Sequence, residues 1–127
     1  MKQPQALRRL IPLALAALLP LLAPHAAQAH ALLRKAIPAV GATLAAAPPE
    51  MTLLFSEGVE PAFTTVEVHD AAGARVNSNT LHTAPDDPKT LLVGLKPLAP
   101  GSYTVEWHAT SVDTHKTQGR FSFTIAP

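Results

Sequence analysis

Apolar and polar residues alternate along most of the chain after residue 50, and this period of two limits the fold more than any other feature. The alternation runs through five stretches: Met51–Glu57, Thr64–His69, Thr90–Leu95, Ser102–Thr110 and Gly119–Ile125. Successive side chains of a strand point to opposite faces of its sheet, so each stretch predicts a strand with one buried face. Tyr103, Val105 and Trp107 share such a face, and we expect them in the core.

Turn-forming residues separate the predicted strands. They occur at Ala71-Ala72-Gly73, at Pro85-Asp86-Asp87-Pro88 and at Pro97–Gly101. Pro48-Pro49 disfavours a helix before Met51, and no segment after residue 30 shows a helical period. Short strands at this spacing predict an all-β fold, an immunoglobulin-like antiparallel β-sandwich of Greek-key topology with about seven strands. The chain has no cysteine, so the Cys…Trp…Cys pattern of antibody domains is absent.

The first 29 residues have the features of a secretory signal peptide. Lys2, Arg8 and Arg9 precede an apolar run from Leu10 to Leu22, and small residues follow at Ala27-Gln28-Ala29. Several prolines interrupt the run, and a spanning helix needs about 20 apolar residues. We therefore expect cleavage after Ala29 and export, with no membrane anchor left after cleavage. This divides the chain into a signal peptide, residues 1–29, and one domain, residues 30–127.

Cleavage changes the charge of the protein. The signal holds three of the ten basic residues and none of the nine acidic ones, so the remainder has a net charge of −2 with histidine neutral. No basic patch is left that would indicate nucleic-acid binding. Without cysteine, a metal site in this domain must use histidine, carboxylate, methionine or backbone donors.

His30 is the first candidate metal ligand, because cleavage after Ala29 makes it the N-terminal residue. A terminal histidine offers its α-amine and its imidazole Nδ1 to one metal ion. The ordinary pKa of the amine is about 7.7–8.0, so a metal displaces its proton easily near neutral pH. Two alternatives remain open: the histidine follows the cleavage site by chance, or cleavage after Ala31 removes it.

Asp113 and His115 are the second candidates. In an extended segment, residues i and i+2 point the same way, so an oxygen and a nitrogen donor would face one point. The pair lies between two predicted strands, at a loop end of the sandwich. The alternative is a solvated turn.

Glu57 is a third candidate, because it shares the parity of Leu53 and Phe55 and would point inward near a strand end. If the strand ends earlier, Glu57 is solvated instead. We expect His69 and His108 on polar strand faces and His82 in a polar loop, as surface residues. Met51 is the only methionine after residue 30, so a Cu(I) site of several thioethers is not available.

Several short segments, in their order and spacing, resemble the CopC family of periplasmic copper-binding proteins. The resemblance covers essentially all of residues 30–127. It rests on His30-Ala31-Leu32, Ile37-Pro38-Ala39-Val40-Gly41-Ala42, Leu53-Leu54-Phe55-Ser56-Glu57-Gly58-Val59, Leu98-Ala99-Pro100-Gly101-Ser102-Tyr103-Thr104-Val105, Trp107, Ser111-Val112-Asp113-Thr114-His115, Gly119 and Phe121-Ser122-Phe123.

This resemblance implies an immunoglobulin-like sandwich that binds one Cu(II) ion per chain. His30 is similar to the terminal ligand, giving amine and imidazole, and Asp113 and His115 are similar to the remaining ligands. Glu57 matches an acidic position close to the metal. Some members carry a second, Met-rich Cu(I) site that this chain lacks. The resemblance also favours cleavage after Ala29 and implies an inner-membrane copper transport protein, of the CopD type, as a partner.

Three functions follow from these residues. The one we favour is a periplasmic binding protein, not an enzyme, that sequesters Cu(II) or delivers it to a membrane partner for copper homeostasis and resistance. An alternative is a copper-dependent oxidative enzyme, because a terminal-histidine copper site also occurs in enzymes that cleave polysaccharides. The third is a metal-free, immunoglobulin-like interaction module.

We predict that the mature protein begins at His30, because Ala27-Gln28-Ala29 is a suitable cleavage signal. Intact-mass measurement of protein purified from the periplasm checks this. A mass corresponding to a start at Leu32 contradicts both the cleavage site and the terminal ligand.

Overall fold

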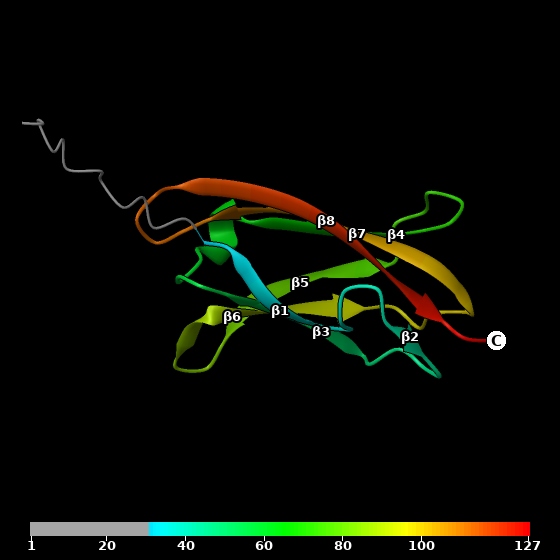
Figure 1. Ribbon diagram of the computed structural model, residues 1–127. Helices are drawn as coiled ribbons and strands as arrows, with labels where there is room; N and C mark the ends of the chain where they lie inside the picture. Colours follow the sequence, from blue (N-terminus) through cyan, green and yellow to red (C-terminus); the bar gives the residue numbers. More distant parts are fainter. Residues whose placement is uncertain (1–30) are drawn as a thin grey trace, which may run out of the picture.

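Residues 31–127 are described by the computed structural model, and they form two four-stranded sheets packed face to face (Figure 1). One sheet has the order β1 (Leu33–Ile37), β3 (Glu50–Phe55), β6 (Asp87–Leu95) and β5 (Asn77–Ala84). The other has the order β2 (Thr43–Leu44), β8 (Lys116–Ile125), β7 (Gly101–Thr110) and β4 (Thr65–Asp70). A single 3-10 turn, η1 (Pro61–Phe63), precedes β4. The predicted all-β sandwich is confirmed.

The five predicted strands correspond to β3, β4, β6, β7 and β8, with ends shifted by up to three residues. Three strands were not predicted: β1, β2 and β5. They lie at sheet edges and bury few side chains, so their sequences lack the alternation of a half-buried strand. The described residues thus hold eight strands, not seven, and the two-residue β2 pairs parallel to β8 rather than antiparallel. His82 lies in β5 and not in a loop.

Aromatic side chains fill the space between the two sheets. The rings of Phe55 and Trp107 meet edge to face, with centroids 5.2 Å apart, and Tyr103 stacks on Phe123 at 5.4 Å. Trp107 lies across Gly119 of the neighbouring strand, where an added Cβ would come within 2.5 Å of the indole ring. Glycine at this position therefore lets the largest core side chain lie flat against β8.

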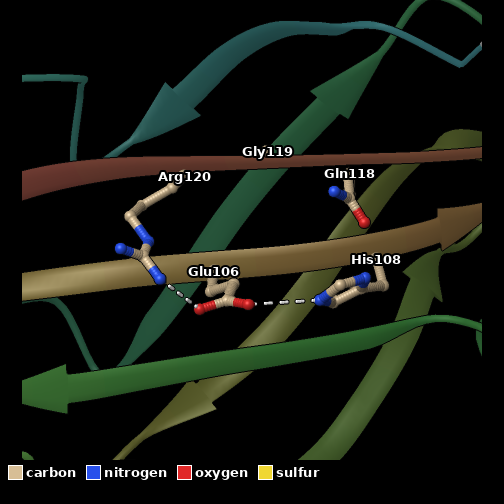
Figure 2. A pocket seen from close by; sticks show the side chains of 5 residues that line it. All are labelled: Glu106, His108, Gln118, Gly119 and Arg120. Atoms are coloured by element: carbon tan, nitrogen blue, oxygen red, sulfur yellow. Dashed lines mark hydrogen bonds and ion pairs between the residues drawn. The ribbon is translucent and has the colours of Figure 1, made fainter.

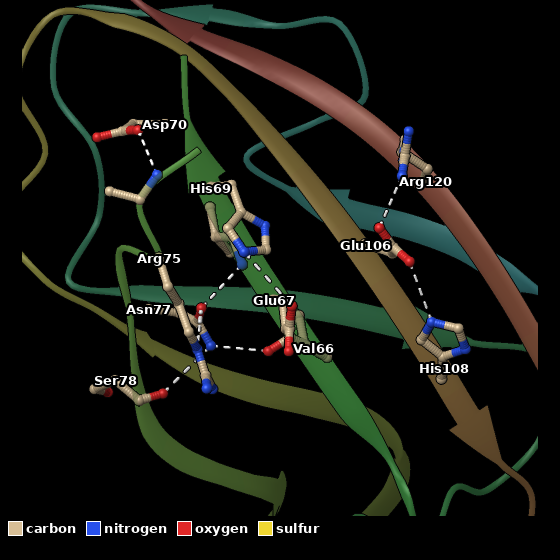
Figure 3. Close-up of polar contacts among 12 residues, drawn as sticks. Val66, Glu67, His69, Asp70, Arg75, Asn77, Ser78, Glu106, His108 and Arg120 are labelled. Atoms are coloured by element: carbon tan, nitrogen blue, oxygen red, sulfur yellow. Dashed lines mark hydrogen bonds and ion pairs between the residues drawn. The ribbon is translucent and has the colours of Figure 1, made fainter. Parts of the chain in front are cut away.

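Asn77 connects the two sheets through its buried side chain. Its amide oxygen accepts a hydrogen bond from the Val68 N–H at 2.9 Å, and its amide nitrogen donates to the Val66 carbonyl at 2.8 Å (Figure 3). Asn77 of β5 thereby provides hydrogen-bond partners for two backbone groups of β4, which is an edge strand of the other sheet. This closes an edge that would otherwise leave buried polar groups without partners.

Among the described residues, no helix has the length and the apolar composition that a bilayer crossing requires.

We predict that Asn77→Ala lowers the free energy of unfolding by about 1–3 kcal/mol, because it leaves a buried N–H and a buried carbonyl without partners. Asn79→Ala is the control, since Asn79 is exposed on the same strand, and should stay within about 0.5 kcal/mol of the wild type. Urea denaturation measures both. Equal stability of the two variants would contradict the bridging role of Asn77.

Candidate functional site

The loop between β7 and β8 holds two of the predicted ligands. The two strands pair from Gly101 opposite Ile125 to Thr110 opposite Lys116, so residues 111–115 form the connection at one end of the sandwich. Backbone hydrogen bonds close this loop: Ser111 N–H donates to the His115 carbonyl at 2.9 Å, and Thr114 N–H donates to the Ser111 carbonyl at 2.9 Å. The loop is therefore a defined turn.

Asp113 and His115 come together in this turn. The carboxylate Oδ2 of Asp113 lies 3.1 Å from Nδ1 of His115, and each side chain is 43% exposed. The sequence predicted an extended segment here, and that prediction is wrong, because residues 112–114 form a turn. The side chains meet instead because Thr114 adopts a left-handed backbone conformation, with φ at 73°. For a β-branched residue this conformation costs about 1–3 kcal/mol, which the surrounding hydrogen bonds must offset.

The carboxylate of Asp113 is held in its ionised form. The Ser111 hydroxyl donates a hydrogen bond to Asp113 Oδ1, and this bond, followed by the one from His115, lowers the pKa of the Asp113 carboxyl below its ordinary value. Asp113 therefore remains an anionic oxygen donor over the whole physiological pH range. With the His115 imidazole nitrogen 3.1 Å away, it offers one oxygen and one nitrogen donor of the kinds that transition-metal ions bind.

The first described residues of the chain are anchored beside this loop. The Ala31 carbonyl accepts a hydrogen bond of 2.7 Å from the hydroxyl of Thr117, which lies two residues beyond His115. Leu32 exchanges two hydrogen bonds with Ser56, through the Ser56 hydroxyl at 2.9 Å and the Ser56 N–H at 2.8 Å. The backbone at residues 31 and 32 is thus fixed between β8 and the end of β3, at the same end of the sandwich as Asp113 and His115 (Figure 1). His30 itself lies outside the described residues.

Glu57 lies near this end of the sandwich but outside a strand. β3 ends at Phe55, and Glu57 follows in a bend, where it is half-buried rather than inward-pointing on a strand. Val59 forms an antiparallel bridge with Ser111, and Val112 N–H donates to the Gly58 carbonyl at 2.9 Å. This pairing brings the segment of Glu57 against the segment of Asp113. Within residues 31–127, however, no three His, Asp or Glu side chains converge on a common metal position.

The other described histidines are surface residues, each beside a glutamate. His69 lies 3.5 Å from Glu67, His108 lies 3.3 Å from Glu106, and His82 lies 4.0 Å from Glu50. His69 and His82 pair with other strand positions, opposite Thr104 and Leu92. His108 pairs with Gln118, next to Thr117, but it is exposed and contacts Glu106 on the outer face of the sheet. His69 and His108 occupy the polar faces of their strands, as predicted.

The outer face of β4, β7 and β8 carries charged residues around an open surface pocket of about 280 Å³, which Glu106, His108, Gln118, Gly119 and Arg120 line (Figure 2). Arg120 binds Glu106 at 2.9 Å, and this bond, followed by the one from His108, lowers the pKa of the Glu106 carboxyl (Figure 3). The groups on this face thus satisfy one another. Exposed pairs of this kind contribute little to stability.

Three residues of the site have roles that their sequence pattern does not show. Ser111 bonds Asp113, Thr117 holds Ala31, and Ser56 holds Leu32. Ser111 offers one local signal, because serine hydroxyls in turns commonly bond nearby backbone groups, as Ser111 does with the His115 N–H. Thr117 and Ser56 offer no such signal. Thr117 bonds Ala31, which is 86 positions away in the sequence, and Ser56 bonds Leu32, which is 24 positions away.

Comparison with known proteins identifies the fold family. The CopC domain family model matches residues 33–126. Protein YobA of Escherichia coli strain K12 is 41% identical over 98 residues, which cover 76% of this chain and 79% of that protein.

Two solved structures have the same fold. CopC from Methylosinus trichosporium OB3b superimposes with a TM-score of 0.72 and 34% identity, covering 77% of this chain and 95% of that one. PcoC, a methionine-rich copper resistance protein from Escherichia coli, gives a TM-score of 0.66 and 29% identity, covering 76% of this chain and 99% of that one. The family model spans most of the sandwich and the loop that holds Asp113 and His115, and the chain therefore belongs to the CopC family.

Proposed function

We propose that this protein binds one Cu(II) ion in the periplasm through His30, Asp113 and His115. The observation that carries the proposal is the pairing of Asp113 and His115 at the end of the sandwich where Ala31 is anchored. His30 directly precedes the anchored Ala31 in the sequence. We propose that its amine and imidazole complete the donor set.

The donor set suits Cu(II) better than other divalent ions. Two nitrogens from His30, one from His115 and one carboxylate oxygen make four donors, which a tetragonal Cu(II) ion accepts in a plane. Zn(II) prefers a tetrahedral arrangement and binds such ligands less tightly. Gly58 and Val59, which follow Glu57, pair with the segment of Ser111 and Val112, and on this ground we propose Glu57 as a neighbouring acidic group.

The site holds Cu(II) and not Cu(I). Cu(I) prefers soft thioether and thiolate ligands. Residues 30–127 contain no cysteine, and Met51 is their only methionine. Met51 is fully buried in the core, away from the loop. PcoC, by contrast, is described as methionine-rich. We therefore propose a single site per chain.

Binding rather than catalysis is the proposed role. The protein would sequester Cu(II), or deliver it to an inner-membrane copper transport partner of the CopD type, in copper homeostasis and resistance. The name of PcoC as a copper resistance protein supports this role. The signal-like segment of residues 1–29, with cleavage after Ala29, supports a periplasmic location.

We predict that mature protein beginning at His30 takes up one equivalent of Cu(II) and gives a tetragonal, nitrogen-rich electron paramagnetic resonance spectrum. His115→Ala should weaken binding, because it removes a nitrogen donor from the loop. Asp113→Asn should weaken it by about 10–100-fold or more, because the amide loses the charge and most of the donor strength. Titration with a competing chelator measures the affinities.

The matched controls are His69→Ala, His82→Ala and His108→Ala, which each remove a histidine beside a glutamate on the surface. These three should retain the wild-type affinity. Equal losses in all four histidine variants would indicate loose surface binding. Saturation at two tight equivalents would contradict the single site.

We predict that one additional residue before His30 strongly weakens Cu(II) binding, since the α-amine becomes an amide and is no longer a simple donor. The test compares protein starting at Met-His30 with protein starting at His30, both purified and of confirmed mass. Equal affinity of the two forms would rule out the terminal chelate while leaving Asp113 and His115 as ligands.

A further inference from the structure

Ser111 has an unusual position for a serine next to an exposed loop. It is fully buried, with 0% of its surface exposed, whereas Asp113 and His115 beside it are 43% exposed. Its hydroxyl contacts three groups of the loop: Oδ1 of Asp113, the His115 N–H at 3.1 Å and the His115 carbonyl at 3.1 Å. Burial and three contacts fix the hydroxyl oxygen.

The directions of these hydrogen bonds follow from the chemistry of a hydroxyl. It has one proton and two lone pairs, so it donates to one group only. The ionised carboxylate of Asp113 is the stronger acceptor and takes the proton, while the hydroxyl oxygen accepts the His115 N–H. A continuous chain thus runs from the backbone of His115 through Ser111 to the carboxylate of Asp113.

This chain restrains the rotation of the Asp113 carboxylate. One oxygen accepts the Ser111 proton, and the other lies 3.1 Å from the imidazole Nδ1 of His115. Without the hydroxyl, the exposed carboxylate would lose one of the two contacts that orient it. The turn is also one that needs support, because Thr114 at its centre has a φ of 73°.

We propose that Ser111 is a positioning residue for the copper site: its buried hydroxyl orients the Asp113 carboxylate and holds it beside His115. This inference rests on the proposed function. Ser111 does not touch the metal and acts through Asp113. Groups that hydrogen-bond metal-ligating side chains affect metal affinity even though they bind no metal.

The test compares Cu(II) affinity and the electron paramagnetic resonance spectrum in four mature proteins: wild type, Ser111→Ala, Ser111→Thr and Asn77→Ala. Ser111→Ala should lower the affinity by about 10–100-fold and change the spectrum. Ser111→Thr keeps the hydroxyl and should recover most of the affinity. Asn77→Ala breaks a buried hydrogen-bonded side chain far from the loop, so it should lose stability and retain wild-type binding.

Two results would overturn the proposal. One is wild-type affinity and spectrum in Ser111→Ala. The other is an equal loss of affinity in Asn77→Ala, which would mean that general destabilisation accounts for the effect.

A measurement on the metal-free wild type does not depend on the folding of any variant. Hydrogen exchange of the His115 backbone N–H should be slow, although the side chain is exposed, because Ser111 Oγ accepts that hydrogen. Exchange at the rate of an unprotected amide would contradict the positioning network. Absence of tight Cu(II) binding in the wild type, with this amide protected, would instead contradict the proposed function alone.

Discussion

The antiparallel pairing of β7 with β8 is the interaction on which the rest of this structure depends. The pairing runs without a break from Gly101 opposite Ile125 to Thr110 opposite Lys116. One face of this ladder supplies the largest part of the core, including Trp107 and Phe123. A slip of one residue would turn those aromatic side chains to solvent, so burial determines the register. The same register determines where the ladder ends, and the loop of Asp113 and His115 begins there.

Polar side chains complete the fold where strand pairing ends. Asn77 satisfies the backbone of β4 from the opposite sheet, and Thr117 and Ser56 hold the backbone at residues 31 and 32. Each of these contacts joins segments far apart in sequence. The contacts made by Thr117 and Ser56 hold residues 31 and 32 at the end of the sandwich that carries Asp113 and His115. The anchoring of residues 31 and 32 therefore supports the function that we propose.

Close pairing of a histidine with a carboxylate does not by itself identify a site in this protein. All four described histidines lie within 4.0 Å of a carboxylate. Three of these pairs lie on strand surfaces, where they contribute little. The fourth combines a left-handed Thr114, a buried serine and an adjacent anchored chain segment. Backbone strain that neighbouring bonds must offset is more typical of a functional site than of a surface pair.

The sandwich class, five of the eight described strands and the candidate donors could be predicted from the residues alone. Period-two alternation reports burial of one face, so it reveals β3, β4, β6, β7 and β8. It misses β1, β2 and β5, because these strands bury few side chains, whereas β4, which also lies at an edge, buries Val66 and Val68. The sequence also placed Asp113 and His115 together, although by an argument for an extended segment. Three features became visible only in the folded chain: a turn around Thr114 joins the two side chains, Ser111 holds the carboxylate, and Thr117 anchors Ala31 beside them. The first two are local to residues 111–115, but they depend on a backbone conformation that residue spacing does not specify. The third joins residues 86 positions apart, and such a contact depends on how the whole chain packs.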